Sequence, residues 1–311
     1  MLVTLNEILE LAEAGKYAVG SFNTPNLESI MAVIGAAEEL NVPVIIMHAQ
    51  VHESMMPIDI IGPIMVEMAK RSRVPVCVHL DHGETLDYLL KALELGFTSV
   101  MYDGSVLPYE ENVANTKLAV KFAHRKGASV EAEIGVLGKR ELGQGHAEDK
   151  DAPPQVYTDP VEAAEFVKDT GIDALACSFG TAHGLYLKKP KLDMGVLERV
   201  KQLVDIPLVM HGGSGVSTED YKNVIKRGIR KINYYTYMAK AGGTGVESKL
   251  QVEKMPLSYR GKDYDLYYYL EEKGKEKGKE KVVYYHDIVD WGIRAMKEDV
   301  KRALKIFSGK E

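Results

Sequence analysis

The sequence predicts one (β/α)₈ barrel of the α/β class, a TIM barrel, with a helical extension at its C-terminus. Three observations support this fold. Eight short β-rich runs follow one another along the chain, amphipathic stretches separate them, and 311 residues exceed the ~250 of a typical barrel by enough for an extension. A doubly wound open sheet is the alternative fold, but such a sheet usually has fewer strands.

The predicted strands are short and mostly apolar, and several carry β-branched residues, as expected for parallel strands that are buried on both faces. In chain order they are YAVGSF (17–22), PVIIMH (43–48), PVCVHL (75–80), TSVMYD (98–103), ASVEAEI (128–134), DALACSF (173–179), PLVMHG (207–212) and RKINYY (230–235). Helical patterns such as residues 26–41 and 85–96 lie between them. Repeated strand–helix units of this number give the strand count of a closed barrel.

Two segments interrupt the alternation of strands and helices. Residues 135–158 are rich in glycine, proline and charge, and we expect them to form an active-site loop, because loops after barrel strands carry function. Residues 236–311 form a C-terminal elaboration, in which the charged repeat 273–281 predicts a solvated loop. An amphipathic helix is expected over 287–307, where it could cover one end of the barrel. We treat residues 1–311 as a single domain.

Composition restricts the partners and the compartment. A net charge of −6 argues against nucleic acid as a partner, and no run of about 18 apolar residues predicts a membrane helix. The N-terminus lacks the basic and apolar regions of a secretory signal. Cys77 and Cys177 lie in apolar runs and are expected to be buried thiols in a reducing compartment. We therefore expect a cytoplasmic protein.

Three histidines each end a separate predicted strand beside a glycine: His82, His183 and His211. Strand ends converge around one mouth of a barrel, so the three imidazoles should lie close together. Three protein ligands with an open position are typical of catalytic zinc. The alternative for any one of them is a hydrogen-bonded structural histidine.

Carboxylates lie close to these histidines. Asp81 precedes His82 and could orient a ligand or act as a general acid and base. Strict strand alternation puts Asp81 and His82 on opposite faces, so a bend before Gly83 is needed to turn His82 towards the mouth. Glu131 and Glu133 share one face of their strand and must pair with a metal or a cation, a buried lysine or arginine being the alternative to metal.

A glycine-rich loop follows the seventh strand, where barrels often bind phosphate together with the loop after the eighth. The run His211-Gly-Gly-Ser-Gly215 offers backbone N–H groups and a hydroxyl, and Asn233 and Thr236 add side-chain donors. The sequence therefore predicts a phosphate site, with an ordinary turn as the alternative.

Taken together, these residues resemble the class II, metal-dependent ketose-bisphosphate aldolases, a family that includes fructose-bisphosphate and tagatose-bisphosphate enzymes. The resemblance covers residues 1–235. The segments that carry it are SFNTPNLES (21–29), VHLDHGE (78–84), SVMYDGS (99–105), PYEENVANTK (108–117), SVEAEIGVLG (129–138), YTDPVEAAEFV (157–167), GIDALACSFGTAHGLYLKKPKL (171–192), PLVMHGGSGV (207–216) and RKIN (230–233).

The resemblance implies a role for each candidate residue. His82, His183 and His211 would hold a zinc ion, with Glu133 as a carboxylate near the metal and a second divalent site as an option. Asp81 would take the proton from the C4 hydroxyl during cleavage, and Glu141 in the loop would be the base at C1 or C3. A phosphate and monovalent-cation (Na⁺ or K⁺) site would be formed by Gly184, Gly212, Gly213, Ser214, Asn233 and Thr236, with Asn23 touching the substrate. A homodimer or homotetramer is also implied.

Departures from the fructose-bisphosphate pattern concentrate where the sugar beyond the metal would be read. Tyr235 replaces a substrate-contacting aspartate, Leu187 replaces a lysine that Lys188 could substitute, and the segment after the second strand begins at Ala49 instead of serine. His48 and His52 in that region are either substrate contacts or structural histidines.

We therefore expect cleavage of a ketose phosphate, such as fructose 1,6-bisphosphate, to glycerone phosphate and an aldehyde. A tagatose-bisphosphate or other ketose-phosphate aldolase, a non-catalytic sugar-phosphate and metal-binding protein, and a metal-dependent epimerase are the alternatives.

Overall fold

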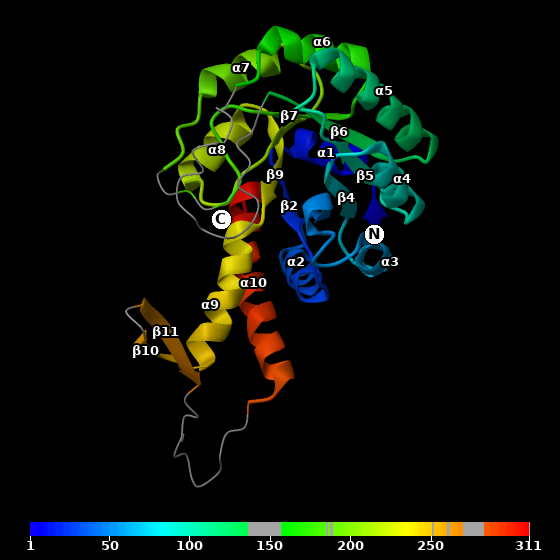
Figure 1. Ribbon diagram of the computed structural model, residues 1–311. Helices are drawn as coiled ribbons and strands as arrows, with labels where there is room; N and C mark the ends of the chain where they lie inside the picture. Colours follow the sequence, from blue (N-terminus) through cyan, green and yellow to red (C-terminus); the bar gives the residue numbers. More distant parts are fainter. Residues whose placement is uncertain are drawn as a thin grey trace.

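The computed structural model describes residues 1–135, 157–184, 186, 189–250, 252–259, 262–269 and 283–310. Within them, a closed barrel of parallel strands confirms the predicted fold (Figure 1). Its strands are β2 (Val19–Asn23), β3 (Val44–Ala49), β4 (Val76–Gly83), β5 (Ser99–Tyr102), β6 (Ser129–Ile134), β7 (Ala174–Cys177), β8 (Leu208–Met210) and β9 (Ile229–Tyr234). Each strand pairs with the next along the chain, and β9 returns to β2. Every predicted strand overlaps one of them.

One apolar layer fills the interior of the barrel, and a second lies between the strands and the surrounding helices. Alternate side chains point inward and fill the barrel, among them Ile45, Cys77 and Val209. The intervening side chains point outward and pack against the helices. Cys77 lies in the inner layer and Cys177 in the outer one; both thiols are buried and free, as predicted.

Helices follow the strands in the expected order. They are α2 (Leu27–Leu40), α3 (Ile58–Arg71), α4 (Leu86–Glu94), α5 (Tyr109–Arg125), α6 (Pro160–Thr170), α7 (Met194–Leu203), α8 (Thr218–Lys226) and α9 (Thr236–Leu250), with a 3₁₀ turn η1 (Gln50–His52) after β3. Before the barrel begins, β1 (Leu2–Val3) pairs with the start of β4. Helix α1 (Leu5–Gly15) places its apolar side chains in the inner layer and so closes the N-terminal end of the barrel.

The C-terminal helix α10 (Tyr285–Ser308) has the predicted amphipathic character but a different place. It packs on α2, α8 and β2, and its buried residues Val300, Leu304 and Phe307 belong to the outer layer. It therefore fills the outer ring between α8 and α2, because α1 already closes the barrel end.

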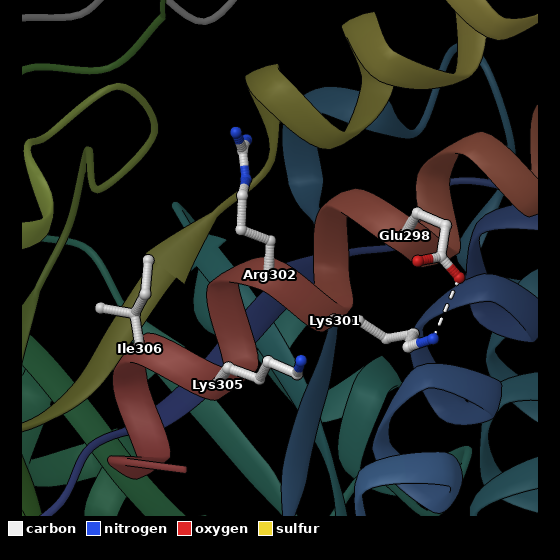
Figure 2. A pocket seen from close by; sticks show the side chains of 5 residues that line it. All are labelled: Glu298, Lys301, Arg302, Lys305 and Ile306. Atoms are coloured by element: carbon white, nitrogen blue, oxygen red, sulfur yellow. Dashed lines mark hydrogen bonds and ion pairs between the residues drawn. The ribbon is translucent and has the colours of Figure 1, made fainter. Parts of the chain in front are cut away.

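A hollow of about 390 Å³ opens on the exposed side of α10 (Figure 2). Its lining residues are Glu298, Lys301, Arg302, Lys305 and Ile306. The adjacent Phe307 carbonyl accepts a hydrogen bond from the Ala18 N–H, just before β2 begins. The hollow thus lies towards the N-terminal ends of the strands, opposite to the end where barrels carry out chemistry.

Helices α9 and α10 continue away from the barrel as an arm that carries the hairpin of β10 (Val252–Tyr259) and β11 (Lys262–Tyr269) (Figure 1). This hairpin was not predicted from the sequence. A Cβ added at Gly245 would lie 2.4 Å from the Ala295 Cβ, so glycine permits the close approach of the two helices. The expected loops at 135–158 and 273–281 lie outside the described residues, apart from the ends of the first. No helix in the described ranges is long and apolar enough to cross a membrane.

Candidate active site

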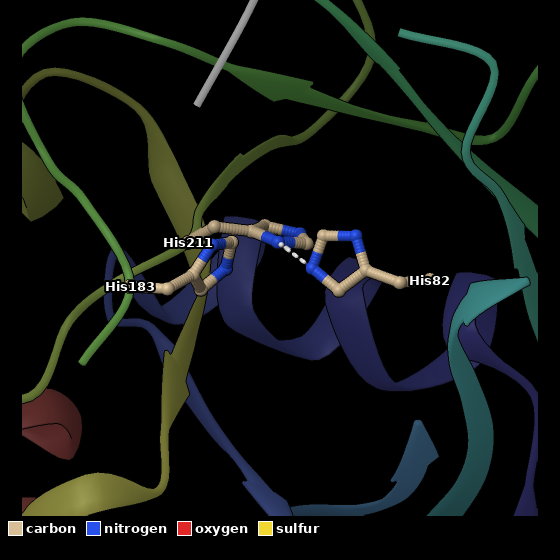
Figure 3. A group of neighbouring side chains, drawn as sticks. All are labelled: His82, His183 and His211. Atoms are coloured by element: carbon tan, nitrogen blue, oxygen red, sulfur yellow. Dashed lines mark hydrogen bonds between the residues drawn. The ribbon is translucent and has the colours of Figure 1, made fainter. Parts of the chain in front are cut away.

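Three imidazoles meet at the C-terminal mouth of the barrel, as predicted (Figure 3). His82 lies near the end of β4, His183 lies in the loop after β7, and His211 directly follows β8. Their ring centroids are 5.0 Å apart for His82 and His183, 4.7 Å for His82 and His211, and 5.7 Å for His183 and His211. Each ring offers one nitrogen to a group whose members lie within 4.8 Å of one another.

A break in strand geometry turns His82 towards this group. The φ angle of His82 is +46°, in the left-handed region that few residues other than glycine adopt. The register of the β4–β5 pairing shifts between Leu80 and Gly83. A Cβ at Gly83 would lie 2.7 Å from the Met101 carbonyl oxygen, so a glycine is needed where the strands approach. The bend expected before Gly83 is therefore present, and it occurs at His82 itself.

In His82 and His211, the ring nitrogen that faces away from the other two imidazoles lies within hydrogen-bond distance of a carboxylate. The His82 Nδ1 lies 2.7 Å from the Asp103 Oδ2, and the His211 Nε2 lies 2.7 Å from the Glu131 Oε1. If each carboxylate accepts an N–H, the His82 Nε2 and His211 Nδ1 face each other with lone pairs across 3.0 Å. Without a cation, one of these two nitrogens must carry a proton. The donor set thus fits a divalent metal held by imidazoles that carboxylates orient.

Burial of Asp103 by itself would raise its pKa, but the hydrogen bond and charge of His82, together with hydrogen bonds from Ser105, outweigh burial and lower the pKa. Asp103 is therefore an anion that can orient a neutral ligand histidine. Asp103 is not among the site residues predicted from the sequence. Its position directly after β5 is the signal that could have found it, since the other candidate residues also lie at strand ends.

The two glutamates of β6 have different partners. Glu131 is fully buried, and its Oε2 lies 2.8 Å from the Nζ of the equally buried Lys231. Burial favours the neutral acid, but Lys231 and the hydrogen bond to His211 lower the pKa of Glu131 to about 2. Glu133 instead offers a carboxylate oxygen to a second group with His82 and Asp103. The buried ion pair considered for these glutamates thus holds for Glu131, whereas Glu133 lies at the metal candidates.

Asp81 is held by one donor on each oxygen. The Asn23 Nδ2 donates to its Oδ2 at 2.8 Å, and the Asn233 Nδ2 donates to its Oδ1 at 3.1 Å. The Oδ1 is also 4.0 Å from the His82 Nε2. Burial would raise the pKa of Asp81, but the neighbouring charges, His82 first, lower it. Asp81 is therefore an oriented carboxylate in the form that accepts a proton.

The glycine-rich loop after β8 packs against the loop after β7 and the end of β9. A Cβ at Gly212 would lie 2.4 Å from the Ala182 carbonyl oxygen, and one at Gly213 would lie 2.6 Å from the Asn233 carbonyl oxygen. The Ser214 Oγ accepts a hydrogen bond of 3.0 Å from the Tyr235 N–H. These contacts join the loops after β7, β8 and β9. The three loops carry the predicted phosphate residues, which are Gly184 after β7, Gly212, Gly213 and Ser214 after β8, and Asn233 and Thr236 at the end of β9 and the start of α9.

The two histidines near β3 differ in their surroundings. His48 points into the outer layer, where its Nε2 lies 3.1 Å from the Tyr88 hydroxyl, and burial lowers its pKa to about 4. This environment agrees with the interpretation of His48 as a structural histidine. His52 lies at the mouth with its ring centroid 5.3 Å from that of Tyr235. Glu141, Leu187 and Lys188 fall outside the described residues.

The chain matches the family model "Fructose-bisphosphate aldolase class-II" over residues 3–311. It is 42% identical to a fructose-bisphosphate aldolase of Geobacillus stearothermophilus over 243 residues, which cover 76% of this chain and 81% of the relative. It is 39% identical to a fructose-bisphosphate aldolase of Staphylococcus aureus over 268 residues, covering 84% of this chain and 91% of the relative.

Solved structures described as aldolases also superpose on the chain. The YdjI aldolase of Escherichia coli superposes with a TM-score of 0.80 at 32% identity, covering 99% of this chain and 97% of that one. A putative fructose-1,6-bisphosphate aldolase of Coccidioides immitis superposes with a TM-score of 0.79 at 26% identity, covering 98% and 97%.

Proposed function

The chain belongs to the class-II fructose-bisphosphate aldolase family, and from this premise we propose how its barrel mouth carries out the aldol reaction. The enzyme is an aldolase, a lyase that breaks and forms a carbon–carbon bond. The observation that carries the proposal is the group of His82, His183 and His211, with the oriented carboxylate of Asp81 only 4.0 Å from His82.

We propose that the three histidines hold one zinc ion, His82 through Nε2 and His211 through Nδ1, because carboxylates engage the opposite nitrogens. Zinc bound there would act as a Lewis acid and stabilise the negative charge that develops on the three-carbon fragment. Glu133 would serve the same ion or a second divalent site, since it shares a ligand group with His82 and Asp103.

Asp81 is the proposed acid and base for the C4 hydroxyl. It takes the hydroxyl proton as the C3–C4 bond breaks, and it returns that proton when the bond forms. Asn23 and Asn233 fix the direction of both carboxylate oxygens, and the lowered pKa keeps Asp81 ready to accept a proton. We propose that Asn23 also contacts the substrate. The base at C1 or C3 is proposed to be Glu141 of the 135–158 loop, on the family resemblance alone.

The phosphate of the three-carbon half would bind where the loops after β7, β8 and β9 meet. The proposed residues are Gly184, Gly212, Gly213, Ser214, Asn233 and Thr236. Backbone N–H groups of a glycine-rich loop and the N-terminus of α9, which begins at Thr236, are donors that suit an anion. The oxygen atoms of the same residues could bind Na⁺ or K⁺ beside the phosphate.

Fructose 1,6-bisphosphate is the proposed substrate, because the relatives at about 40% identity carry that name. Tagatose 1,6-bisphosphate is the second candidate. It differs in configuration at C4, the carbon whose hydroxyl would face Asp81, and Ala49 and Tyr235 alter the part of the mouth beyond that carbon.

A cleavage assay tests this function. The zinc-loaded enzyme should split a ketose bisphosphate into glycerone phosphate and an aldehyde, and a chelator or His183→Ala should abolish the reaction. A panel of fructose, tagatose, sorbose and psicose bisphosphates and their monophosphates identifies the substrate. Activity that survives both metal removal and His183→Ala would contradict the proposal, and an isomerised sugar in place of two fragments would indicate an epimerase.

We propose that the enzyme is a homodimer or homotetramer of the cytoplasm. The arm supports association, because an isolated two-stranded hairpin such as β10–β11 is marginally stable in water and gains from packing on another chain. The free, buried thiols of Cys77 and Cys177 fit a reducing compartment. Sedimentation equilibrium should show two or four chains, whereas a monomer would contradict the assembly without affecting the catalytic proposal.

A further inference from the structure

A second, larger hollow lies at the end of the barrel opposite to the histidine group. Its volume is about 670 Å³, and it is lined by the end of α1, helix α8, the start of β9 and the end of α10. These elements are far apart in the sequence, but α10 packs on α8 and the chain ends beside them (Figure 1). Small-molecule sites typically measure ~300–1,000 Å³, so the hollow is large enough for a small organic ligand.

Four cationic side chains line this hollow. Lys16 follows α1, Lys222 and Lys226 lie on α8, and Arg230 lies near the start of β9. Lys222 and Lys226 are exposed, and because they are four residues apart they share one face of the helix. Among the lining residues that the structure describes, none carries a carboxylate. In a chain with a net charge of −6, the hollow is therefore a local concentration of positive charge.

Glu13 neutralises only part of this charge. Its carboxylate accepts hydrogen bonds from the Lys16 Nζ at 2.5 Å and from the Arg230 Nε at 2.6 Å. Burial would raise the pKa of Glu13, but these hydrogen bonds lower it to about 2. Glu13 thus sets one negative charge against two positive ones. Arg230 also donates to the Ile225 and Ile229 carbonyl oxygens at 2.8 and 2.9 Å, which fixes its guanidinium in place.

The two lysines of α8 add two further positive charges. In the described part of the chain, no carboxylate forms an ion pair with Lys226. A lysine at the end of a helix also stabilises the helix dipole, but this effect is confined to the last turn. The dipole accounts for Lys226, the last residue of α8, and not for Lys222 one turn earlier. A bound anion accounts for both.

Apolar side chains form another part of the lining. Ile225 and Phe307 are buried there, and Ile306 is partly buried. A Cβ at Gly15 would lie 2.6 Å from the Tyr17 ring, so glycine leaves room for this ring at the hollow. No described group hydrogen-bonds to the Tyr17 hydroxyl, and burial raises the pKa of Tyr17, so the hydroxyl stays a donor. Cations beside apolar groups suit an anion that has an organic part.

This hollow is separate from the proposed active site. Arg230 and Asn233 lie towards opposite ends of β9, three residues or roughly 10 Å apart along the strand. Lysine ammonium groups bind phosphate as point charges, and a tyrosine hydroxyl can donate to a phosphate oxygen. We propose that the hollow bounded by Tyr17, Lys222 and Lys226 binds a small organic phosphate, at a site distinct from that of the sugar substrate.

Calorimetric titration of the zinc-loaded enzyme with phenyl phosphate tests this inference, because the probe joins one phosphate to an apolar ring. Lys222→Met/Lys226→Met should lower the affinity for phenyl phosphate by roughly 10- to 100-fold, as for the loss of hydrogen bonds to a charged group. Inorganic phosphate should bind more weakly than phenyl phosphate, since it buries no apolar surface. Phenol, which lacks the charge, should also bind more weakly.

Lys117→Met/Lys121→Met is the matched control, because these exposed lysines have the same spacing on α5. Phenyl phosphate bound at the barrel mouth would be common to the wild type and both double variants, so the difference between the variants isolates the hollow. Cleavage of fructose 1,6-bisphosphate without the probe should be the same in all three proteins. Equal affinities of the two double variants for phenyl phosphate would overturn the inference, and so would equal binding of phenol and phenyl phosphate by the wild type.

Discussion

The barrel mouth has two sides that are built in different ways. On the metal side the proposed ligands His82, His183 and His211 meet, and on the ring-pair side the rings of His52 and Tyr235 meet. On the metal side, His82 and His211 each contact a carboxylate at 2.7 Å, and Glu131 is in turn paired with Lys231. On the other side, His52 lies on a three-residue turn and meets Tyr235 through a ring contact. Strand ends are fixed by the ladder hydrogen bonds of the barrel, whereas η1 is held through Glu53, which accepts hydrogen bonds from the Tyr88 hydroxyl and the Ile58 N–H.

The two sides therefore differ in how readily their residues can be exchanged. Charged partners buried in the barrel are costly to change, because each removal leaves a charge or a donor without its partner. The turn after β3 and the residue after β9 can be exchanged without disturbing those pairs.

The largest effect is expected for Asp81→Ala, which removes the proposed proton acceptor between the two sides. Turnover should fall by roughly 10²–10⁴-fold, the usual contribution of an acid–base residue. Zinc content should stay the same, because Asp81 lies 4.0 Å from the nearest ligand candidate nitrogen. Steady-state cleavage together with atomic absorption measures both. A loss of zinc that accounts for the lost activity would show that Asp81 serves the metal instead.

The buried ion pair gives the next effect, on stability. Lys231→Met leaves the Glu131 carboxylate without its cation inside the barrel, and we expect the free energy of unfolding of the metal-free protein to fall by about 3–5 kcal/mol. The double variant Glu131→Gln/Lys231→Met should recover most of that loss. Lys16→Met is the control, because Lys16 is mostly exposed in its pair with Glu13 and should contribute only ~0–1 kcal/mol. Urea unfolding that ranks Lys231→Met with Lys16→Met would contradict the buried-pair account.

The same pair illustrates what the sequence can predict. The barrel strands were predictable because buried parallel strands leave apolar runs, and His82, His183 and His211 stood out as strand-end residues beside glycine. Lys231 lies on β9, and its partner Glu131 lies on β6. A charged residue inside an apolar run gives no indication of a partner so far along the chain until the barrel is closed.

The ring pair and the arm were harder to predict for related reasons. His52 and Tyr235 meet only because β3 and β9 flank β2, a relation that exists in the closed sheet and not in the order of the chain. The hairpin β10–β11 was missed because it is rich in tyrosine and charged residues and adjoins the charged repeat 273–281, a composition typical of solvated connections.

A third prediction concerns pH and the layer behind the ring pair. Burial first, and the neighbouring His52 second, lower the pKa of His48 from 6.5 to about 4. Below pH 6.5 the unfolded chain binds the proton and the folded chain does not, so stability falls as pH falls. This loss amounts to at most about 1.4 kcal/mol per pH unit and ends once pH has dropped through about 4. His48→Gln should remove this loss of stability between pH 6.5 and 4, whereas the control His286→Gln should show the same loss as the wild type. If the free energy of unfolding fell with pH equally in the wild type and in His48→Gln across that window, His48 would not be the source of the loss.

The smallest effect, on zinc affinity, is expected for Asp103→Asn, and it tests most directly whether the two sides act independently. Asp103→Asn keeps the shape of the side chain that contacts the His82 Nδ1 but removes its charge, so the imidazole loses an anionic acceptor. Loss of such an orienting partner typically weakens metal affinity by roughly 10–100-fold. Competition with a chromophoric chelator measures this for zinc, and His52→Ala should bind zinc as the wild type does. If His52→Ala weakened zinc binding as much as Asp103→Asn, the two sides would be one cooperative unit. If only Asp103→Asn does so, metal binding does not depend on the ring pair, because different strands and turns carry the two sides.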